Sequence, residues 1–252
     1  MRLRLLLAAA AVAALLSACK GTKRIEYYGE IYNQQPATVL VVPVNDLSMR
    51  RALREEADSL FNQSLNTASI QLYLTAADPL TNKGYYVPGP LASAELAASL
   101  GRTGKQLRNE NINDIGSQLG IDALLFIDIL EWNQSFNSWS VKVEYVMRST
   151  HSNSEILHVH VNAVKVLPTD FKGNPKPLSD DIAFARRYGC DLETAQRCRL
   201  VEILNQYVLK DLPSGQRARQ HSSERYMKPH PEYFNLRIGK DGSVELLKDE
   251  EL

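Results

Sequence analysis

The sequence predicts an α+β domain in which a mixed, largely antiparallel sheet of about five strands packs against helices. Two apolar runs, 37–44 and 122–132, are nearly continuous, as is typical of strands that are covered on both faces. Residues 139–147 and 156–165 instead alternate side chains between two faces, which is typical of an antiparallel meander. With the helical patterns between the two apolar runs, these strands give one domain whose helices cover the sheet.

Apolar residues recur at helical spacing between the first two strands. Segment 53–65 has this spacing with charged residues on its other faces, so it is predicted to be an amphipathic helix. Segment 70–82 fits a strand as well as a helix, and we choose a helix that ends near Gly84, because glycine commonly follows a last helical turn. Shorter elements are predicted after it: a strand at 85–87 and helices at 91–100 and 113–120.

The N-terminal residues have the three-part layout of a secretory signal. Arg2 and Arg4 precede an uncharged apolar run over 5–16, and small residues then lead to Cys19. The run has about a dozen residues, fewer than the roughly 20 that a helix needs to cross the hydrocarbon core of a membrane. Residues 1–18 are therefore interpreted as a cleaved signal peptide.

The end of this segment, Leu16-Ser17-Ala18-Cys19, resembles the bacterial lipobox, in which the cysteine thiol receives a diacylglycerol and becomes the first mature residue. A plain signal peptide with an incidental cysteine is the alternative. Lys20 follows, and no acidic residue precedes Glu26, so the acidic signals that direct some lipoproteins elsewhere are absent. We expect Cys19 to anchor the chain in the outer membrane, facing the periplasm. Each buried CH₂ of an acyl chain contributes about 0.8 kcal/mol, so two or three chains make release negligible.

Length and composition are those of an ordinary globular protein, with 252 residues, 44% hydrophobic and 23% charged. Without residues 1–18 the chain has 27 basic and 29 acidic residues, so we predict no nucleic-acid partner. The polar segment 19–35 is predicted to be a lipidated tether, 36–212 the α+β globular domain, and 213–252 a C-terminal arm. Segment 233–247 has the pattern of a hairpin within that arm.

Cys190 and Cys198 remain once Cys19 is acylated, and two thiols are the right number for one disulfide in an oxidising periplasm. Eight residues of helix would separate their Cα atoms by about 12 Å, beyond the roughly 4.4–6.8 Å that a disulfide tolerates. We therefore expect the last helix to begin near Cys198, with 191–197 in a loop. Redox catalysis is the alternative, but the spacing is not that of a Cys-x-x-Cys motif.

No catalytic or metal-binding constellation is apparent, so we predict no catalytic residue, no metal and no cofactor. His158 and His160 share one strand face and could chelate an ion, but no third ligand is apparent, because the other histidines lie in turns or tails. Polar residues on an exposed sheet face are the simpler interpretation. The sequence has no Gly-x-Ser-x-Gly nucleophile elbow and no phosphate-binding loop of the Gly-x-x-x-x-Gly-Lys type.

Three groups of residues follow the lipobox in a recognisable order: 36–43 (Pro-Ala-Thr-Val-Leu-Val-Val-Pro), 78–80 (Asp-Pro-Leu) leading into 84–87 (Gly-Tyr-Tyr-Val), and 120–127 (Gly-Ile-Asp-Ala-Leu-Leu-Phe-Ile). Over roughly 16–165 the chain thereby resembles the GNA1162 family of bacterial lipoproteins, also catalogued as a domain of unknown function. The resemblance implies a fold similar to the N-terminal domain of TolB and to lipoprotein activators of penicillin-binding proteins. Because members often accompany lipoproteins similar to CsgG, the curli export pore, it implies an envelope accessory role and no catalytic residue.

The sequence thus predicts a non-enzymatic lipoprotein that binds envelope proteins as an accessory in outer-membrane assembly or secretion, with a CsgG-like lipoprotein as a candidate partner. A periplasmic hydrolase is the alternative. The chain departs from the family pattern around 50–67 and at 170–197. We expect the partner surface within these segments, at 50–56 and 170–197. Arginine is enriched at protein interfaces, and a surface arginine can be replaced without disturbing the core. The competing interpretation is that these arginines are ordinary solvated surface residues. The candidate residues are Arg50, Arg51, Arg54, Arg186 and Arg187.

Overall fold

The structure is a computed structural model of the 252-residue chain. It describes residues 27–28, 30–48, 68–102, 104–135, 137–172, 174, 176–190, 195–210, 212–215, 230–231 and 233–247. The predicted signal peptide, the lipid-attachment residue Cys19 and the predicted helix at 53–65 lie outside the described residues. So do three of the five candidate partner-surface arginines, Arg50, Arg51 and Arg54.

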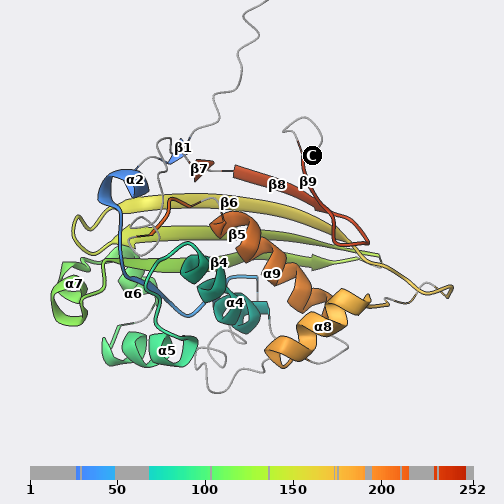
Figure 1. The fold of residues 1–252 in the computed structure, drawn as a ribbon, viewed down its shortest axis with the longest axis horizontal. Helices are drawn as coiled ribbons and strands as arrows, with labels where there is room; N and C mark the ends of the chain where they lie inside the picture. The colour runs from blue at the N-terminus through green and yellow to red at the C-terminus, as the bar shows by residue number, and fades with distance from the viewer. Residues whose placement is uncertain are drawn as a thin grey trace, which may run out of the picture.

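A seven-stranded mixed sheet forms the centre of the molecule (Figure 1). Its strands are β2 (Val39–Val41), β3 (Asn45–Asp46), β4 (Ala123–Gln134), β5 (Ser138–Ser149), β6 (Glu155–Val166), β8 (Tyr233–Ile238) and β9 (Val244–Leu246). Strands β4, β5 and β6 form the predicted antiparallel meander. Both β2 and β3 run parallel to β4, while β8 runs parallel to β6 and antiparallel to β9. The α+β class is confirmed.

The sheet is larger than the predicted five strands, because three strands are added while the strand predicted at 85–87 is not part of it. Residues 45–46 add a short parallel strand beside β4, after the chain has passed Pro43. The hairpin of β8 and β9 adds two strands beyond β6, because buried side chains at Phe234, Leu236 and Ile238 complete the core. Separately, β1 (Tyr27–Tyr28) pairs with β7 (His230–Pro231) in a two-stranded sheet.

Helices cover both faces of the sheet. They are α2 (Glu30–Gln34), α4 (Ala68–Asn82), α5 (Pro90–Ser99), α6 (Gly104–Asn109), α7 (Asn113–Leu119), α8 (Ser179–Tyr188) and α9 (Ala195–Leu209). Figure 1 shows α4 and α9 in front of the central strands, with α8 beside the start of α9. The prediction of a helix rather than a strand over 70–82 is confirmed by α4. The strand predicted at 85–87 is wrong, since only Tyr86 makes an isolated bridge, to Thr38.

Strand β4 separates two hydrophobic clusters, which explains its continuous apolar sequence. Leu125 and Ile127 belong to the larger cluster, which includes residues of α4 and α9. Leu124 and Phe126 belong to the smaller cluster, with residues of α6 and α7. All four side chains are at most 4% exposed. The prediction that this strand is covered on both faces is therefore confirmed.

Two segments outside the predicted 36–212 domain also contribute to the core. Ile31 of α2 is fully buried in the larger cluster, and so is Ile238 of β8. The division of the chain into tether, domain and arm stays a prediction. The folded unit nevertheless draws buried side chains from both sides of that range.

Candidate functional site

A row of polar side chains crosses the sheet on the face opposite α4 and α9. Asp128 in β4, Glu144 in β5, His160 in β6 and Tyr233 in β8 are direct partners across successive strands. Alternate residues of a strand point to one face, so His158 lies on this face beside His160. The neighbours of Glu144 in sequence, Val143 and Tyr145, point instead into the larger core cluster. The pleat of β5 and β6 therefore collects these polar groups on one side.

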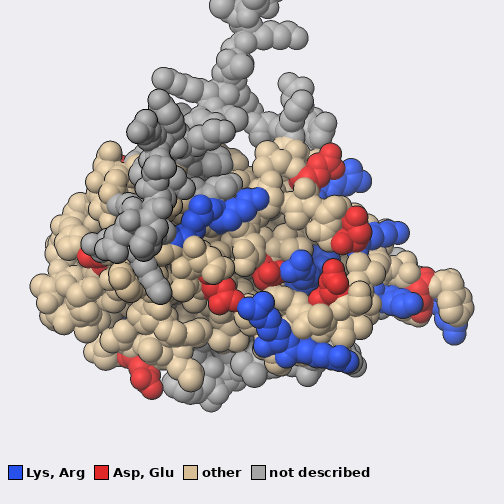
Figure 2. Space-filling view, in the orientation of Figure 1, with Lys and Arg blue, Asp and Glu red and all other residues tan. Residues whose placement is uncertain are grey.

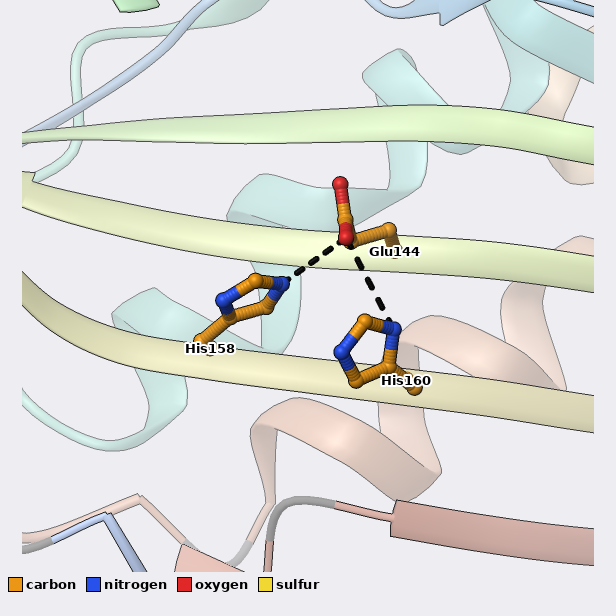
Figure 3. A group of neighbouring side chains, drawn as sticks. All are labelled: Glu144, His158 and His160. Atoms are coloured by element: carbon orange, nitrogen blue, oxygen red, sulfur yellow. Dashed lines mark hydrogen bonds and ion pairs between the residues drawn. The ribbon is translucent and has the colours of Figure 1, made fainter.

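Two imidazole rings point at the carboxylate of Glu144 from the neighbouring strand (Figure 3). Oε1 of Glu144 lies 2.8 Å from Nε2 of His158 and 3.6 Å from Nδ1 of His160. The other ring nitrogen of His158, Nδ1, lies 3.2 Å from Oε2 of Glu155. The ring of His160 stacks on Tyr233, with 5.0 Å between the ring centroids. One carboxylate oxygen is thus shared by two histidines whose rings are held by further contacts.

Arg108 of α6 holds the other side of the same carboxylate. Its guanidinium donates to Oε2 of Glu144 and to Oδ2 of Asp128. The helix end that presents Arg108 is fixed by Arg148 of β5, which donates to the carbonyl oxygens of Leu107 at 2.7 Å and Glu110 at 3.0 Å, and to that of Arg108 itself. These carbonyls belong to the last turn of α6 and the residue after it, where a helix has no internal donors to offer. Arg148 therefore positions Arg108 over the polar row.

The electrostatics of the row follow from these contacts. The hydrogen bond from His158 lowers the pKa of Glu144 to about 2, and the charge of Arg108 acts in the same direction. The same bond raises the pKa of His158. Burial raises the pKa of Asp128, which Arg108 only partly offsets. Glu144 is therefore held as a carboxylate, and the bond between the two groups favours the protonated form of His158.

This arrangement predicts an acid-dependent contribution of Glu144 to stability. The pKa of Glu144 is about 2 in the folded chain against an ordinary value of 4.5, so the unfolded chain binds the proton at higher pH. The contribution is fully present above about pH 5 and is lost as the pH falls towards 2. We expect the difference in unfolding free energy between the wild type and Glu144→Gln to shrink by about 3 kcal/mol over that interval. Denaturant unfolding at several pH values measures it, and a difference that does not change with pH would contradict it.

His158 and His160 share one face of β6, as predicted, and their side chains are 29% and 34% exposed. No third ligand beside them was predicted, whereas Glu144 lies close enough to both that the three residues could hold one ion. The sequence spacing around the hairpin turn could have predicted that Glu144 lies beside these histidines. Glu144 and His160 are each eight residues from Ser152 in the hairpin turn, and an antiparallel hairpin pairs positions that are equally far from its turn.

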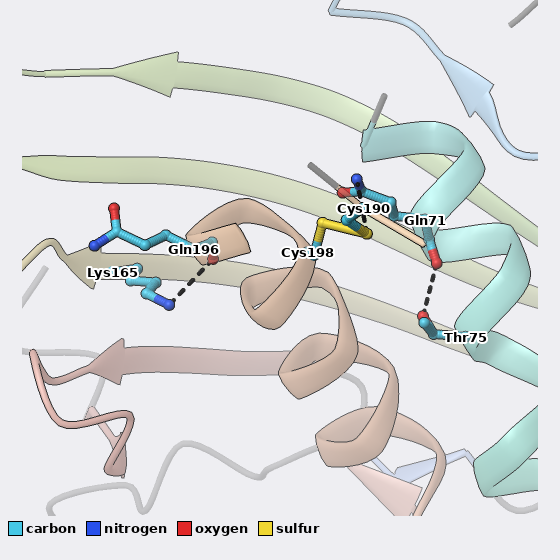
Figure 4. The surroundings of a disulfide bond; sticks show 6 residues. All are labelled: Gln71, Thr75, Lys165, Cys190, Gln196 and Cys198. Atoms are coloured by element: carbon cyan, nitrogen blue, oxygen red, sulfur yellow. Dashed lines mark hydrogen bonds between the residues drawn. A yellow bond between two sulfur atoms is a disulfide. The ribbon is translucent and has the colours of Figure 1, made fainter. Parts of the chain in front are cut away.

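Cys190 and Cys198 are joined by a disulfide bond (Figure 4). Gly189 ends α8 in the left-handed conformation with φ of 70°, so the chain turns back before Cys190. The Cα atoms of the two cysteines are 6.8 Å apart. The prediction that α9 begins near Cys198 after a loop over 191–197 is wrong by one turn: α9 begins at Ala195, because the left-handed turn already brings Cys190 back towards the helix.

The disulfide is expected to stabilise the fold by closing the short loop between α8 and α9. On the chain-entropy model, a loop of about nine residues contributes roughly 2.6 kcal/mol, so a double Cys190→Ala, Cys198→Ala variant should lose about this much unfolding free energy. Denaturant unfolding of the oxidised wild type and the variant measures the loss. Free reaction of both thiols with a maleimide in native, unreduced protein would contradict the bond.

Arg186 and Arg187 lie in the last turn of α8, where positive charge is favourable beside the helix C-terminus. Arg187 is 74% exposed and lies 4.0 Å from Asp78, while its guanidinium lies 5.4 Å from the centre of the Tyr188 ring. Figure 2 shows that charged side chains of both signs are spread over this view of the surface. Both arginines are therefore accessible, as a partner surface requires, and their role stays a prediction.

Comparison with known proteins gives no family assignment. No family model matches the chain, and no curated protein matches it either. Lipoprotein GNA1162 from Neisseria meningitidis is 19% identical, with 51% of this chain and 83% of that chain covered and a TM-score of 0.40. The hypothetical protein CT253 from Chlamydia trachomatis is 16% identical, with 69% and 97% covered and a TM-score of 0.37. The C-terminal domain of LpoB from Salmonella enterica is 13% identical, with 50% and 82% covered and a TM-score of 0.26.

At TM-scores below 0.5 these likenesses carry no argument about function. The resemblance to GNA1162 that the apolar segments suggest recurs among the solved structures, without showing membership of that family. Within the part of the chain that the structure describes, no helix is both long and apolar enough to cross a membrane.

Proposed function

We propose that the protein is a lipid-anchored component of the bacterial outer membrane that faces the periplasm and binds other envelope proteins without catalysing a reaction. The observation that carries the proposal is the motif Leu16-Ser17-Ala18-Cys19 at the end of an export signal. Lys20 and the lack of acidic residues before Glu26 support retention at the outer membrane. The disulfide between Cys190 and Cys198 supports an oxidising compartment.

A periplasmic hydrolase is the second candidate, because the structure brings His158, His160 and a carboxylate together. The state of that carboxylate argues against it. A general base works best when its pKa is near the working pH, whereas the pKa of Glu144 is about 2 and its oxygens are already shared between Arg108 and the two histidines. The cluster is therefore better suited to holding a cation than to removing a proton from water.

Replacement of the lipid-bearing thiol tests the anchor. We expect Cys19→Ser to prevent acylation, so that the chain leaves the outer-membrane fraction as an unprocessed or soluble form. Membrane fractionation with detection of the full chain measures this. The neighbouring variant Lys20→Ser keeps the thiol and should remain in the outer membrane. If Cys19→Ser partitions as the wild type does, the lipobox interpretation is wrong.

The partner surface is proposed to include Arg50, Arg51, Arg54, Arg186 and Arg187, with a CsgG-like lipoprotein as the candidate partner implied by the family resemblance. Crosslinking in living cells followed by affinity purification of the full chain should recover an envelope protein. Replacing Arg50, Arg51 and Arg54 together with serine should reduce recovery without changing the melting temperature. Arg237→Ser, at an exposed arginine of β8, is the matched control.

Two results would count against this proposal. Recovery of no envelope protein by the wild-type chain would contradict the protein-binding function. Undiminished recovery by a normally folded triple variant would remove the first arginine cluster from the partner surface, and a further Arg186→Ser, Arg187→Ser variant tests the second cluster in the same way.

A further inference from the structure

We propose that Glu144, His158 and His160 bind a divalent transition-metal ion of the zinc class. Two imidazoles and one carboxylate form a ligand set that suits zinc and its neighbours in the first transition row, whereas calcium and magnesium prefer oxygen ligands alone. The proposal departs from the expectation of no metal, which rested on the lack of a third ligand. It goes beyond the proposed function, because neither anchoring nor partner binding requires an ion.

The spacing of the ligand atoms fits one ion. Atoms that are bound to zinc at about 2.0–2.1 Å with tetrahedral angles lie roughly 3.3 Å from one another. The distances from Oε1 of Glu144 to the nearer nitrogens of His158 and His160 are 2.8 Å and 3.6 Å, on either side of that value. One ligand atom from each of the three residues lies within 4.8 Å of the others. Small side-chain rotations would therefore place all three around one ion.

The surrounding residues hold the ligands in suitable orientations. Glu155 can accept a hydrogen bond from the Nδ1–H group of His158, since the two atoms are 3.2 Å apart. This tautomer leaves the lone pair of Nε2 directed at the site. Arg108 occupies Oε2 of Glu144 and leaves Oε1 for the ion. Such partners are usual around metal sites: a metal-bound histidine commonly donates a hydrogen bond to a carboxylate, and a ligating carboxylate commonly accepts one from a nearby donor. Both ligating strands belong to the central meander, so the backbone beneath the site is fixed by pairing on both sides.

The charge of the neighbourhood permits a divalent ion. The charged groups around the two histidines are the carboxylates of Asp128, Glu144 and Glu155 and the guanidinium groups of Arg108 and Arg148. With both imidazoles neutral these leave one negative charge. A divalent ion would bring this neighbourhood to one positive charge, so the three carboxylates offset most of the charge of the ion and the two guanidinium groups.

The partly exposed histidines also provide access. His158 is 29% exposed and His160 is 34% exposed, so an ion can reach the ligands from solvent and a water molecule can complete its coordination. The guanidinium of Arg108 lies next to the site and will weaken binding. We therefore expect a dissociation constant in the micromolar range or just below it.

A zinc titration of the full chain tests the proposal. The protein is purified in detergent without a polyhistidine tag, treated with a chelator and titrated with Zn²⁺ in competition with a chromophoric chelator. We expect one ion per chain, with at least tenfold weaker binding in His158→Gln, His160→Gln and Glu144→Gln. His151→Gln is the matched control, because His151 lies in the hairpin turn, is 70% exposed and pairs with Asp122 away from the three ligands. It should bind as the wild type does, and excess Mg²⁺ should not compete.

A second readout needs no variant and so does not depend on how well a substituted chain folds. Co²⁺ bound to the wild-type chain should give visible ligand-field absorption that Zn²⁺ removes and Mg²⁺ does not. Circular dichroism of each variant shows whether it retains the fold. Absence of zinc binding and of the cobalt spectrum at micromolar ion would overturn the proposal, and so would equal zinc affinity of folded His158→Gln, His160→Gln and wild-type chains.

Discussion

Replacement of Asp181 by alanine is expected to lower the free energy of unfolding by about 3–5 kcal/mol, because it leaves a buried lysine without its counter-charge. Lys165 of β6 is 2% exposed, and its Nζ lies 3.6 Å from Oδ1 of Asp181 and 3.1 Å from the carbonyl oxygen of Gln196. Figure 4 shows Lys165 and Gln196 close to the disulfide at the start of α9. Burial lowers the pKa of Lys165, which the charge of Asp181 partly offsets.

Two companion variants separate the charge effect from local effects of the substitution. Asp180→Ala removes an exposed acid from the same turn of α8 and should change the unfolding free energy by less than about 0.5 kcal/mol. The double variant Lys165→Met, Asp181→Asn replaces the buried charges with neutral groups of similar size and should recover most of the loss. Denaturant unfolding at pH 7 measures all three. A double variant as unstable as Asp181→Ala would contradict the ion-pair explanation.

Arg148→Met is expected to have an effect of similar size, about 3–5 kcal/mol, because several buried acceptors lose one donor group. Arg148 is 5% exposed and donates to three carbonyl oxygens at the end of α6. It also donates to the backbone and side-chain oxygens of Asn153 in the hairpin turn, at 3.1 and 2.8 Å. Its loss should free the end of α6 and withdraw Arg108 from Glu144.

Another cation on the same strand supplies the control for Arg148. Lys142 is on the same face of β5, is 48% exposed and pairs with Glu131 at 2.9 Å. Surface pairs of this kind contribute about 0–1 kcal/mol, so Lys142→Met should have little effect. The two variants are compared by denaturant unfolding. Equal losses of unfolding free energy in the two variants would contradict the prediction, because Arg148 would then contribute no more than an ordinary surface cation.

The elements that local sequence determines were predicted well. The apolar run around Leu125 specified a strand covered on both faces, and the stop at Gly84 specified the end of α4. The parallel pairing of β8 with β6 was missed, because it joins residues about 70 positions apart and no local pattern encodes that partner. The start of α9 was also missed, since it depends on a left-handed turn at Gly189.

The candidate site divides in the same way. His158 and His160 were visible as alternating polar residues on one strand face. Glu144 was not recognised because its place beside them depends on the register of the β5–β6 hairpin. Arg108 comes from α6, which precedes these strands in the chain, and its contact with Glu144 follows from tertiary packing alone. Pairs within one strand can thus be predicted, whereas ligands from a second element require the register.

We propose above that the chain is a lipoprotein held at the membrane through Cys19. Mass spectrometry of the N-terminal peptide, taken from protein extracted from the membranes of its native cells, tests it most directly. The peptide should begin at Cys19 and carry the mass of a diacylglycerol, with or without a further acyl chain on the new amino terminus. A peptide that begins at another residue, or that contains an unmodified Cys19, would contradict the claim.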